Sequence, residues 1–517
     1  MTNSAPFALS VLLACAALPA QTLAPARMTK IGTVDPRYQS FNIEMVEVTG
    51  GRFWAPYKTA GAAPPPPPDA KLATPGIDPS LFRYRPPIDL ANSRLRKLAA
   101  ALGPSYVRVS GTWANSAYFH DSDTPAPKTP PPGFGGILTR PEWRGVIAFA
   151  RAVDSRIVTS FTISGGVRSS DGVWTPAQAE KFLAFTRASG GSIAAAEFFN
   201  EPTFASMGGA PKGYDAAAYG RDFKIFRAML RRVSPRTLIL GPGSIGEAGG
   251  LSSFANLKSA GMLSASGPGV DAFSYHFYGT VSQRCAAMNP SLQTTPGAAL
   301  SEDWLARTAR DRDFYAALRD RFEPGKPLWL TETGETACGG NPWAATFLDS
   351  FRYLDQLGRL ARSGVQVVIH NTLAASDYAL IDEDTLTPRP NYWSAWLWRN
   401  LMGTTVLDPG PNPDPSVHLY AHCLRNHPGG VALLAINTSR DSAHDLSTST
   451  PARRYTLTAP ELTADTVQLN GQTLQTGPGD SLPQLASVPA PAGAVTLAPA
   501  SITFLAFPAA ANQSCRE

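Results

Sequence analysis

Two glutamates stand where an enzyme could use them as a catalytic pair. Glu201 follows an apolar run at 195–199 and is directly preceded by Asn200, and Glu332 follows a second apolar run at 328–331. Hydrolysis of a glycosidic bond needs one protonated carboxyl group to release the leaving oxygen and one carboxylate to attack the anomeric carbon. Most glutamates are exposed or ion-paired, but two at the ends of β-type runs favour catalysis.

Other polar residues follow the same runs. Glu335 lies three residues beyond Glu332 and is a rival carboxylate, but it stands past the end of the run and ranks below Glu332. His276 and Tyr278 lie at the end of a run at 272–277, where an imidazole or a phenol could hydrogen-bond the nucleophile and help to separate two pKa values. The alternative for both is a packed aromatic cluster.

Other chemistries find little support in the sequence. Segment 241–246 has the spacing of a dinucleotide-binding loop, but the chain contains 44 glycines and no acid follows about 20 residues later in a suitable unit. A serine elbow, a zinc-binding HExxH helix and a phosphate loop are absent. We therefore predict no cofactor and no metal. A net charge of +5 over 517 residues is too dilute to indicate nucleic acid as a partner.

Eight β-type runs alternate with helical segments between residues 36 and 403, a pattern typical of an α/β (β/α)8 TIM barrel. The carboxyl ends of barrel strands share one face, so Glu201 after the fourth strand and Glu332 after the seventh should meet there. The predicted strands are 41–48, 106–110, 157–164, 195–199, 238–240, 272–277, 328–331 and 365–369. The predicted helices include 178–188, 217–233, 304–322 and 344–363.

Residues 404–517 have a different pattern and predict a C-terminal β-sandwich domain, to which 27–35 are a candidate addition. Short β-type runs alternate there with Gly, Pro, Asn and Ser, at 417–424, 431–437, 454–457, 467–469 and 502–507. Two proline-rich stretches, 64–68 and 125–136, follow the first two barrel strands. We expect them in loops on the catalytic face.

The first residues indicate export. An apolar stretch at 5–20 is too short to span a bilayer and precedes small residues, so 1–26 are predicted as a signal peptide of a secreted or periplasmic protein. A lipid anchor at Cys15, within Leu12-Leu13-Ala14-Cys15, is the alternative. No later segment is predicted to cross a membrane.

Four cysteines remain after the predicted signal peptide, and an exported protein is expected to oxidise them to two disulfides. Three pairings are open. We favour Cys285 with Cys338, which would join two adjacent loops, and Cys423 with Cys515, which would close the C-terminal domain.

Several short motifs, strongest between residues 327 and 407, resemble those of a known family. They are WLTET at 329–333, CGG at 338–340, YLDQLG at 353–358, VVI at 367–369, DYALID at 377–382, NYW at 391–393, LMGT at 401–404 and VQLNG at 467–471. With Asn200-Glu201 and the cysteine pair Cys423 and Cys515, they resemble the heparanase family, glycoside hydrolase family 79 of barrel clan A. The resemblance runs from about residue 38 to the C-terminus.

The resemblance implies that Glu201 is the acid/base and Glu332 the nucleophile of a retaining enzyme. It also implies that amides of Gly339 and Gly340 and the hydroxyl of Tyr378 bind a glucuronate carboxylate. Backbone N–H groups and a phenol can hold an anion without a strong local cation. The full predicted substrate-binding set is Asn200, His276, Tyr278, Gly339, Gly340, Tyr378, Glu44 and Asn115.

The predicted function is thus a retaining glycoside hydrolase that cleaves β-glucuronide bonds in glucuronate-bearing oligo- or polysaccharides, by exo or endo action. One alternative is a clan A glycosidase for a xyloside, an arabinoside or a glucan. The other is a non-catalytic carbohydrate-binding protein, which the presence of both carboxylates disfavours. Nothing in the sequence predicts an oligomeric state.

Overall fold

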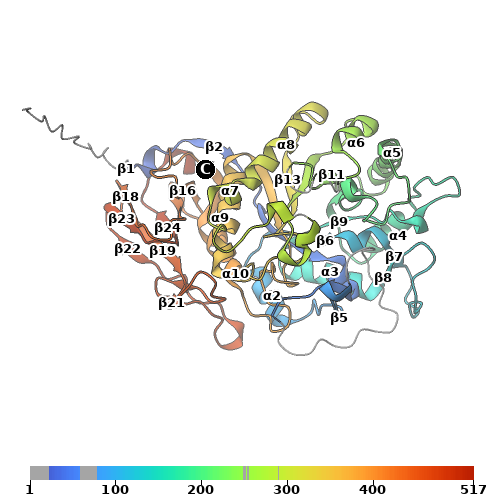
Figure 1. Ribbon diagram of the computed structural model, residues 1–517, viewed down its shortest axis with the longest axis horizontal. Helices are drawn as coiled ribbons and strands as arrows, with labels where there is room; N and C mark the ends of the chain where they lie inside the picture. The colour runs from blue at the N-terminus through green and yellow to red at the C-terminus, as the bar shows by residue number, and fades with distance from the viewer. Residues whose placement is uncertain (1–21, 59–78, 249–251, 253–254, 289, 517) are drawn as a thin grey trace, which may run out of the picture.

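The structure, a computed structural model, describes residues 22–58, 79–248, 252, 255–288 and 290–516. Figure 1 shows a barrel with helices around it and, beside it, a strand-rich domain formed mainly by the C-terminal residues. The predicted combination of a TIM barrel and a C-terminal β-sandwich is confirmed. Cys15, the proline run 64–68 and most of the predicted signal peptide lie outside the described residues.

Eight parallel strands close into a barrel in the order β10-β11-β12-β13-β14-β3-β6-β9. The strands are β3 (Gln39–Glu44), β6 (Ser105–Ser110), β9 (Ser155–Ser160), β10 (Ile193–Glu197), β11 (Leu238–Ser244), β12 (Ala272–Phe277), β13 (Leu328–Thr333) and β14 (Val365–His370). Every one overlaps a run that the sequence predicted.

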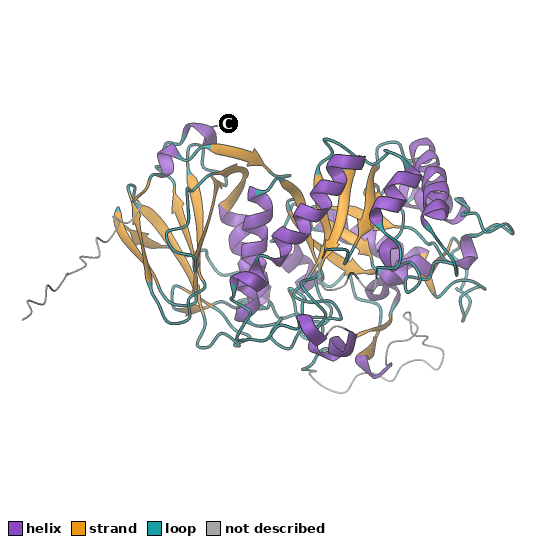
Figure 2. Cartoon of the chain, turned by 45° about the horizontal axis from the view of Figure 1, so that its top comes forward, coloured by secondary structure: helices purple, strands orange, loops and turns teal. Residues whose placement is uncertain are grey.

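Each barrel strand is followed by a helix, and Figure 2 shows these helices around the strands. Two of the longer loops end in a capping residue: Asn92 caps α2 and Asp215 caps α5, each accepting a backbone N–H. The helices are α1 (Met45–Thr49), α2 (Ser93–Ala100), α3 (Arg140–Ala152), α4 (Ala177–Ala188), α5 (Ala216–Val233), α6 (Ser259–Ser266), α7 (Glu302–Leu305), α8 (Arg307–Phe322), α9 (Phe347–Arg362) and α10 (Pro390–Leu401). Short 3-10 helices cover Pro25–Arg27, Pro79–Leu81, Thr112–Ser116, Gly165–Val167, Pro202–Phe204, Gln283–Met288, Pro290–Leu292, Pro478–Asp480 and Gln513–Cys515.

The first barrel strand is shorter than predicted. We expected a strand over 41–48, but β3 ends at Glu44 and α1 begins at Met45. Glu44 and Glu47 form a capping box: the Glu44 side chain accepts the backbone N–H of Glu47, and the Glu47 side chain accepts the backbone N–H of Glu44. The apolar residues after Glu44, which the sequence pattern assigned to the strand, therefore belong to helix α1.

The barrel interior changes from apolar to polar toward its carboxyl end. Tyr106 and Trp329 pack inside it with ring centroids 4.9 Å apart, in an apolar cluster with residues of β9, β10, β11, β12 and β14. Two residues further along the same strands, the buried side chains are Arg108 and Thr331. Because alternate residues of a barrel strand point inward, the residue types along each strand place the polar layer above the apolar one.

Two small ribbons cover the carboxyl face. β4 (Gly51–Trp54) pairs with β5 (Phe82–Arg85), and β7 (Ala117–His120) pairs with β8 (Gly136–Thr139). Arg85 fixes the first ribbon through a buried ion pair with Glu47, at 3.1 Å. The predicted loop 125–136 lies between β7 and β8, on this face, as expected.

The second domain consists of two sheets around a separate apolar core. The nine-stranded sheet contains β2 (Lys30–Thr33), β15 (Met402–Leu407), β16 (Val417–Leu424), β17 (Val431–Asn437), β24 (Ser501–Phe507), β19 (Ala452–Thr458), β20 (Gln468–Leu469), β21 (Gln472–Thr473) and β22 (Val488–Ala490). The three-stranded sheet contains β1 (Thr22–Leu23), β18 (His444–Thr448) and β23 (Gly493–Leu497).

Helix α9 joins the two domains. It contacts β14 of the barrel on one side and β16 and β17 of the larger sheet on the other. Asp355 of α9 accepts hydrogen bonds from Tyr420 at 2.6 Å and from His418 at 2.7 Å. A side chain at Gly358 would come within 2.3 Å of the Tyr420 ring, so a glycine is needed for this close approach.

The N-terminal segment belongs to the sandwich. Strand β2, which lies in the candidate addition 27–35, pairs with β15 of the larger sheet. Strand β1, which precedes this segment in the chain, pairs with β18 of the smaller sheet. Leu23 is buried, which places the last residues of the predicted signal peptide 1–26 inside the domain. We propose that the signal peptide ends before Thr22 and that the domains comprise 36–403 and, for the sandwich, 404–517 with 22–35.

The structure contains the two favoured disulfides. Cys285 and Cys338 join the loops after β12 and β13, and Cys423 of β16 joins Cys515 near the C-terminus. Within the described part of the chain, no helix is long and apolar enough to cross a membrane.

Replacing both Cys423 and Cys515 by serine should lower the free energy of unfolding of the sandwich by about 2–4 kcal/mol, because the bridge spans 92 residues. Urea titration followed by fluorescence would measure the loss. Mass spectrometry of the non-reduced wild type should show no free thiol at any of the four bridged cysteines, and a free Cys515 would contradict this pairing.

Candidate active site

The structure brings Glu201 and Glu332 together at the carboxyl end of the barrel. An oxygen of each carboxyl group and a ring nitrogen of His276 all lie within 4.8 Å of one another. Glu332 is 6% exposed and the Glu201 side chain is 15% exposed. Two carboxyl groups this close can act on one glycosidic bond without a water molecule between the nucleophile and the sugar.

Two backbone irregularities orient the side chains of Glu201 and Glu332, which are called the acid pair below. A register shift between β12 and β13 aligns Glu332 with His276, although the preceding pair is Leu330 with Tyr275. Such a bulge changes the direction of the side chains that follow it. Glu201 has φ of 50°, in the left-handed region that non-glycine residues rarely adopt. Residues held in this region are common at functional sites.

Asn115 holds the turn before Glu201. Its Oδ1 accepts a hydrogen bond from the backbone N–H of Asn200 at 2.8 Å, and its Nδ2 donates to the carbonyl of Asn200 at 2.9 Å. We expected Asn115 to bind a sugar hydroxyl. Instead, both ends of its amide bind the backbone, and the side chain is buried away from the cleft.

Arg108 is a buried cation that links the acid pair to a third carboxylate, Glu197. Its Nη1 donates to Oε2 of Glu332 at 2.7 Å, and its Nε and Nη2 donate to Oε2 of Glu197 at 3.1 and 2.8 Å. Nη2 also donates to Oδ1 of Asn200 at 2.7 Å. Burial by itself would raise the pKa of Glu197, but Arg108 and His276 hold that pKa below its usual range.

The other oxygen of Glu332 faces a pair of tyrosines. The Tyr278 hydroxyl donates to Oε1 of Glu332 at 3.0 Å. Nδ2 of Asn371 donates to the hydroxyls of Tyr278 and Tyr378, at 2.9 and 3.2 Å. Glu332 therefore accepts one hydrogen bond on each oxygen, from Arg108 and from Tyr278.

The surroundings of Glu201 favour a proton. Burial and the nearby charge of Glu332 raise the pKa of Glu201, and the opposing effects of His276 and Arg108 do not cancel that rise. Nδ1 of His276 lies 3.1 Å from Oε1 of Glu201. Burial would lower the pKa of His276, but Glu332, Glu197 and Glu201 together raise it to about 9. Glu201 and Glu332 therefore lie in different electrostatic surroundings.

Glu201, His276 and Glu332 are also close enough to share a metal ion. Both oxygens of Glu332 are already hydrogen-bond acceptors, and the Arg108 guanidinium lies 2.7 Å from one of them. A second cation would be repelled by that guanidinium. These residues fit a hydrogen-bonded acid pair better than a metal centre.

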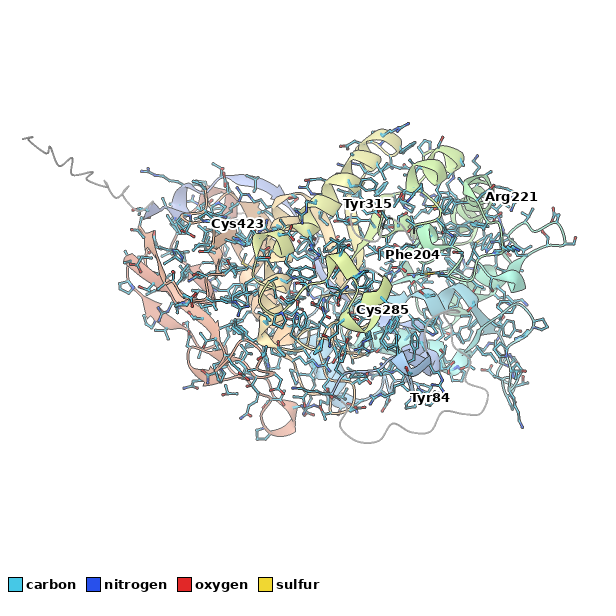
Figure 3. All side chains as sticks on the ribbon, viewed as in Figure 1. Tyr84, Phe204, Arg221, Cys285, Tyr315 and Cys423 are labelled. Atoms are coloured by element: carbon cyan, nitrogen blue, oxygen red, sulfur yellow. A yellow bond between two sulfur atoms is a disulfide. The ribbon has the colours of Figure 1, made fainter. Side chains whose placement is uncertain are left out.

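The acid pair opens into a cleft. Its walls are mainly aromatic and apolar, which suits the flat faces of sugar rings. The lining residues are Glu44, Phe53, Trp54, Gly111, Thr112, Trp113, Glu201, Phe204, Met207, Ile245, Tyr278, Val281, Glu332, Ala337, Cys338, Asn371 and Tyr378. Figure 3 labels Phe204 of this cleft and Cys285, whose disulfide partner Cys338 lies in the cleft wall.

Glu44 brings a further carboxyl group into the cleft. Burial and the charge of Glu332 raise the pKa of Glu44 well above its usual range. Its Oε2 has no hydrogen-bond partner. Gly111 approaches that oxygen so closely that a Cβ there would lie 1.5 Å from it. The free Oε2 atom of Glu44 in the cleft wall can bind a hydroxyl group of a ligand.

The predicted carboxylate-binding segment lies beside Tyr378. Cys338, Gly339 and Gly340 have φ of 63°, 83° and 84°, and a Cβ at Gly340 would lie 3.1 Å from the Tyr378 backbone nitrogen. Cys338 lines the cleft, whereas Gly339 and Gly340, the next two residues in the chain, are not among the lining residues. The backbone N–H groups of these three residues make no hydrogen bond to any other residue that the structure describes.

Glu335 is not a member of the acid pair. Its oxygens accept hydrogen bonds from the Thr336 hydroxyl at 2.8 Å and from the backbone and side chain of Asn341 at 2.8 and 3.1 Å. It is 1% exposed and does not line the cleft. The ranking of Glu332 above Glu335 agrees with this placement.

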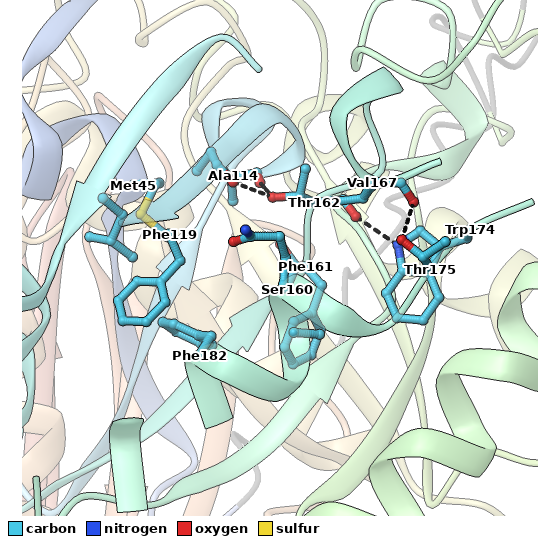
Figure 4. Close-up of a pocket in the computed structure, with 14 residues that line it drawn as sticks. Met45, Ala114, Phe119, Ser160, Phe161, Thr162, Val167, Trp174, Thr175 and Phe182 are labelled. Atoms are coloured by element: carbon cyan, nitrogen blue, oxygen red, sulfur yellow. Dashed lines mark hydrogen bonds between the residues drawn. The ribbon is translucent and has the colours of Figure 1, made fainter. Parts of the chain in front are cut away.

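A second cavity, shown in Figure 4, has a different character. It lies between β9, α4 and the β7–β8 ribbon and includes neither member of the acid pair. The Thr162 hydroxyl donates to Ala117 at 2.6 Å, and Thr175 donates to Val167 at 3.0 Å. Both hydroxyl groups thus bind the backbone, whereas Oε1 of Gln178, which also lines the cavity, is buried without a hydrogen-bond partner among the described residues.

The sequence analysis missed Arg108, Glu197 and Asn371. Arg108 interrupts an apolar strand, and Glu197 follows one isoleucine and three alanines. Both are therefore charged residues within runs that form the barrel core. That pattern was a signal that could have identified them. Asn371 follows β14 and carried no comparable signal.

Comparison with known sequences supports the family. The family model described as "Glycosyl hydrolase family 79, N-terminal domain" matches residues 87–358. Mouse heparanase is 27% identical over 494 residues, covering 84% of this chain and 87% of its own. The hyaluronoglucuronidase of Hirudo nipponia is 26% identical over 478 residues, covering 83% of this chain and 92% of its own.

Solved structures share the fold. A 4-O-α-L-rhamnosyl-β-D-glucuronidase from Fusarium oxysporum 12S superposes with a TM-score of 0.62 at 14% identity, covering 94% of this chain and 99% of that chain. An arabinofuranosidase superposes with a TM-score of 0.63 at 13% identity, over 94% and 99%. From the sequence match over more than half of its length, the chain belongs to glycosyl hydrolase family 79 and is a glycoside hydrolase of the heparanase-like type.

Proposed function

We propose that this glycoside hydrolase is a retaining β-glucuronidase of glucuronate-bearing glycans, with Glu332 as nucleophile and Glu201 as acid/base. The proposal rests on one observation: the two carboxyl groups lie within 4.8 Å of each other in opposite electrostatic surroundings. Arg108 and Tyr278 bind Glu332, whereas burial and Glu332 raise the pKa of Glu201.

The first step would transfer the sugar to the enzyme. A carboxylate oxygen of Glu332 attacks the anomeric carbon, and the proton of Glu201 passes to the leaving glycosidic oxygen as its bond breaks. Glu332 then becomes a neutral ester. Its charge no longer raises the pKa of Glu201, so Glu201 becomes a better base for the second step.

In the second step, Glu201 takes a proton from water, and the water oxygen attacks the anomeric carbon and releases Glu332. Two displacements at one carbon return the β configuration. Because Glu201 must hold a proton in the first step, activity should decline as pH rises through its raised pKa.

Recognition of glucuronate is supported by groups beside Tyr378. The amides of Gly339 and Gly340 and the Tyr378 hydroxyl are donors suited to a carboxylate. The name of the Hirudo nipponia relative and the glucuronidase title of the Fusarium oxysporum structure point the same way. The disulfides agree with an exported enzyme that meets extracellular glycans.

Wild-type enzyme should hydrolyse 4-nitrophenyl β-glucuronide about 100-fold or more better than the matching β-glucoside, because two or three charge-assisted hydrogen bonds hold the carboxylate. Tyr378→Phe should lose part of that preference. Values of kcat/KM for both substrates and both proteins measure it. Equal losses for the two sugars would remove Tyr378 from recognition, and a wild type that prefers glucoside, xyloside or arabinoside would overturn the glucuronidase assignment.

Glu201→Gln should slow an alkyl glucuronide by about 10²- to 10³-fold but slow 4-nitrophenyl glucuronide much less, because a nitrophenolate leaves without a proton. Steady-state rates on the two substrates give the comparison. Equal slowing of both would argue that Glu201 is not the acid.

A further inference from the structure

Glu197 is a buried carboxylate that the double displacement leaves without a role. It ends β10, four residues before Glu201, is 0% exposed and does not line the cleft. A fully buried charge is costly unless hydrogen bonds compensate it. Its position directly beneath the acid pair therefore requires an explanation.

Glu197 is held by groups from several barrel strands. Oε2 accepts the two bonds from Arg108 of β6, and Oε1 accepts the Thr331 hydroxyl of β13 at 2.7 Å. Nε2 of His276 lies 3.7 Å from Oε1. Gly243 of β11 leaves room, since a Cβ there would lie 3.0 Å from Oε1.

Arg108 binds both Glu197 and Glu332, and His276 lies within 3.7 Å of Glu197, Glu201 and Glu332. Arg108 offers Nη1 to Glu332 and its other face to Glu197. His276 turns Nδ1 toward Glu201, and its Nε2 lies 3.2 Å from Nη2 of Arg108 and 3.7 Å from Oε1 of Glu197. Glu197 can therefore share the positive charge of Arg108 with Glu332 and help to orient the His276 imidazole.

We propose that Glu197 is a positioning residue for the acid pair: through Arg108 it limits the positive charge on Glu332, and through His276 it directs an N–H to Glu201. Without Glu197, the guanidinium would neutralise Glu332 alone and weaken its attack. The imidazole would lose the anion behind it. This inference rests on the proposed function of Glu201 and Glu332.

The test compares Glu197→Gln with wild type on the glycoside that wild type hydrolyses best. Because the amide keeps the size but not the charge, kcat should fall about 10- to 100-fold while KM stays within about twofold. The acid limb of the pH profile should move to lower pH, since Arg108 then stabilises only the Glu332 carboxylate. The charged or titratable groups around these carboxylates are Arg108, His276, Glu201, Glu332, Glu44, Tyr219, Tyr278 and Tyr378.

Glu323→Gln is the matched control. Glu323 is another buried glutamate, 2% exposed, and it binds the backbone N–H groups of Gly269 and Val270 before β12, at the opposite end of the barrel. It should leave kcat and the acid limb unchanged. A Glu197→Gln variant with the kcat, KM and acid limb of wild type would overturn the proposal, as would an equal loss in the control.

Two further measurements cover the other outcomes. If Glu197→Gln does not fold, Thr331→Val removes a single hydrogen bond from Glu197, and it should still lower kcat several-fold at constant KM; an unchanged kcat would overturn the proposal. If wild type cleaves no glycoside, the proposed function fails, and nitrogen NMR of His276 still tests Glu197. Its titration midpoint should fall by about one pH unit or more in Glu197→Gln and not in Glu323→Gln.

Discussion

Glu332→Gln should lower kcat by about 10⁴-fold or more, the largest effect expected of any single substitution in this enzyme. An amide cannot form the glycosyl ester on which the first displacement depends. It keeps the shape of the side chain, but its single oxygen can replace only one of the two acceptor atoms that bind Arg108 and Tyr278, at 2.7 and 3.0 Å in the wild type. Rates with 4-nitrophenyl glucuronide and a thermal melt of the same sample separate lost chemistry from lost folding.

A smaller nucleophile variant makes this test sharper. Glu332→Gly with added azide should regain turnover and release the α-configured sugar azide, because azide enters from the face that Glu332 leaves empty. Wild type should release the β-configured sugar, as seen by NMR before mutarotation. An α first product from wild type would show an inverting mechanism and reject Glu332 as nucleophile.

Arg108→Met should remove nearly all activity and also lower the free energy of unfolding by about 3–5 kcal/mol. Arg108 is 0% exposed and is the hydrogen-bonded cation of both Glu197 and Glu332. Its loss leaves two buried carboxylates without their charge partner. Urea denaturation at neutral pH measures the stability, and a loss below about 1 kcal/mol would contradict the role assigned to this ion pair.

The pH dependence of this loss has a definite sign. In wild type, the pKa of Glu197 lies below its usual range, so its ionised form contributes stability above the unfolded pKa and loses that contribution as pH falls through the folded pKa. Without Arg108, burial should raise the pKa of Glu197, and protonation then stabilises the folded variant. The stability difference between the two proteins should therefore shrink from pH 7 to pH 5.

Adding Glu197→Gln to Arg108→Met should recover part of the lost stability, because it removes one of the two buried carboxylates that Arg108 no longer binds. Residues in one hydrogen-bond network are expected to be non-additive in this way. Fully additive losses would show that Arg108 and Glu197 act independently. Activity should not return, since Glu332 still lacks its cation.

Much of the fold was readable from local patterns. The barrel strands follow from short apolar runs between helical segments, and the acid pair follows from glutamates at the ends of two of those runs. The strand expected at 41–48 was wrong beyond Glu44, because apolar periodicity does not reveal that Glu44 and Glu47 cap each other's turn. Similarly, Asn115 stands on a loop facing the site, and only its side-chain direction shows that it binds the Asn200 backbone.

By itself, the sequence determined the eight-stranded barrel, the sandwich and the identity of the acid pair, because strand periodicity and strand-end position are properties of neighbouring residues. Only the tertiary structure decided which charged groups surround each acid. Arg108 is 89 residues from Glu197 and 224 residues from Glu332 along the chain, yet it binds both. Charges act through space and burial, and closing the barrel is what brings these groups within hydrogen-bonding distance.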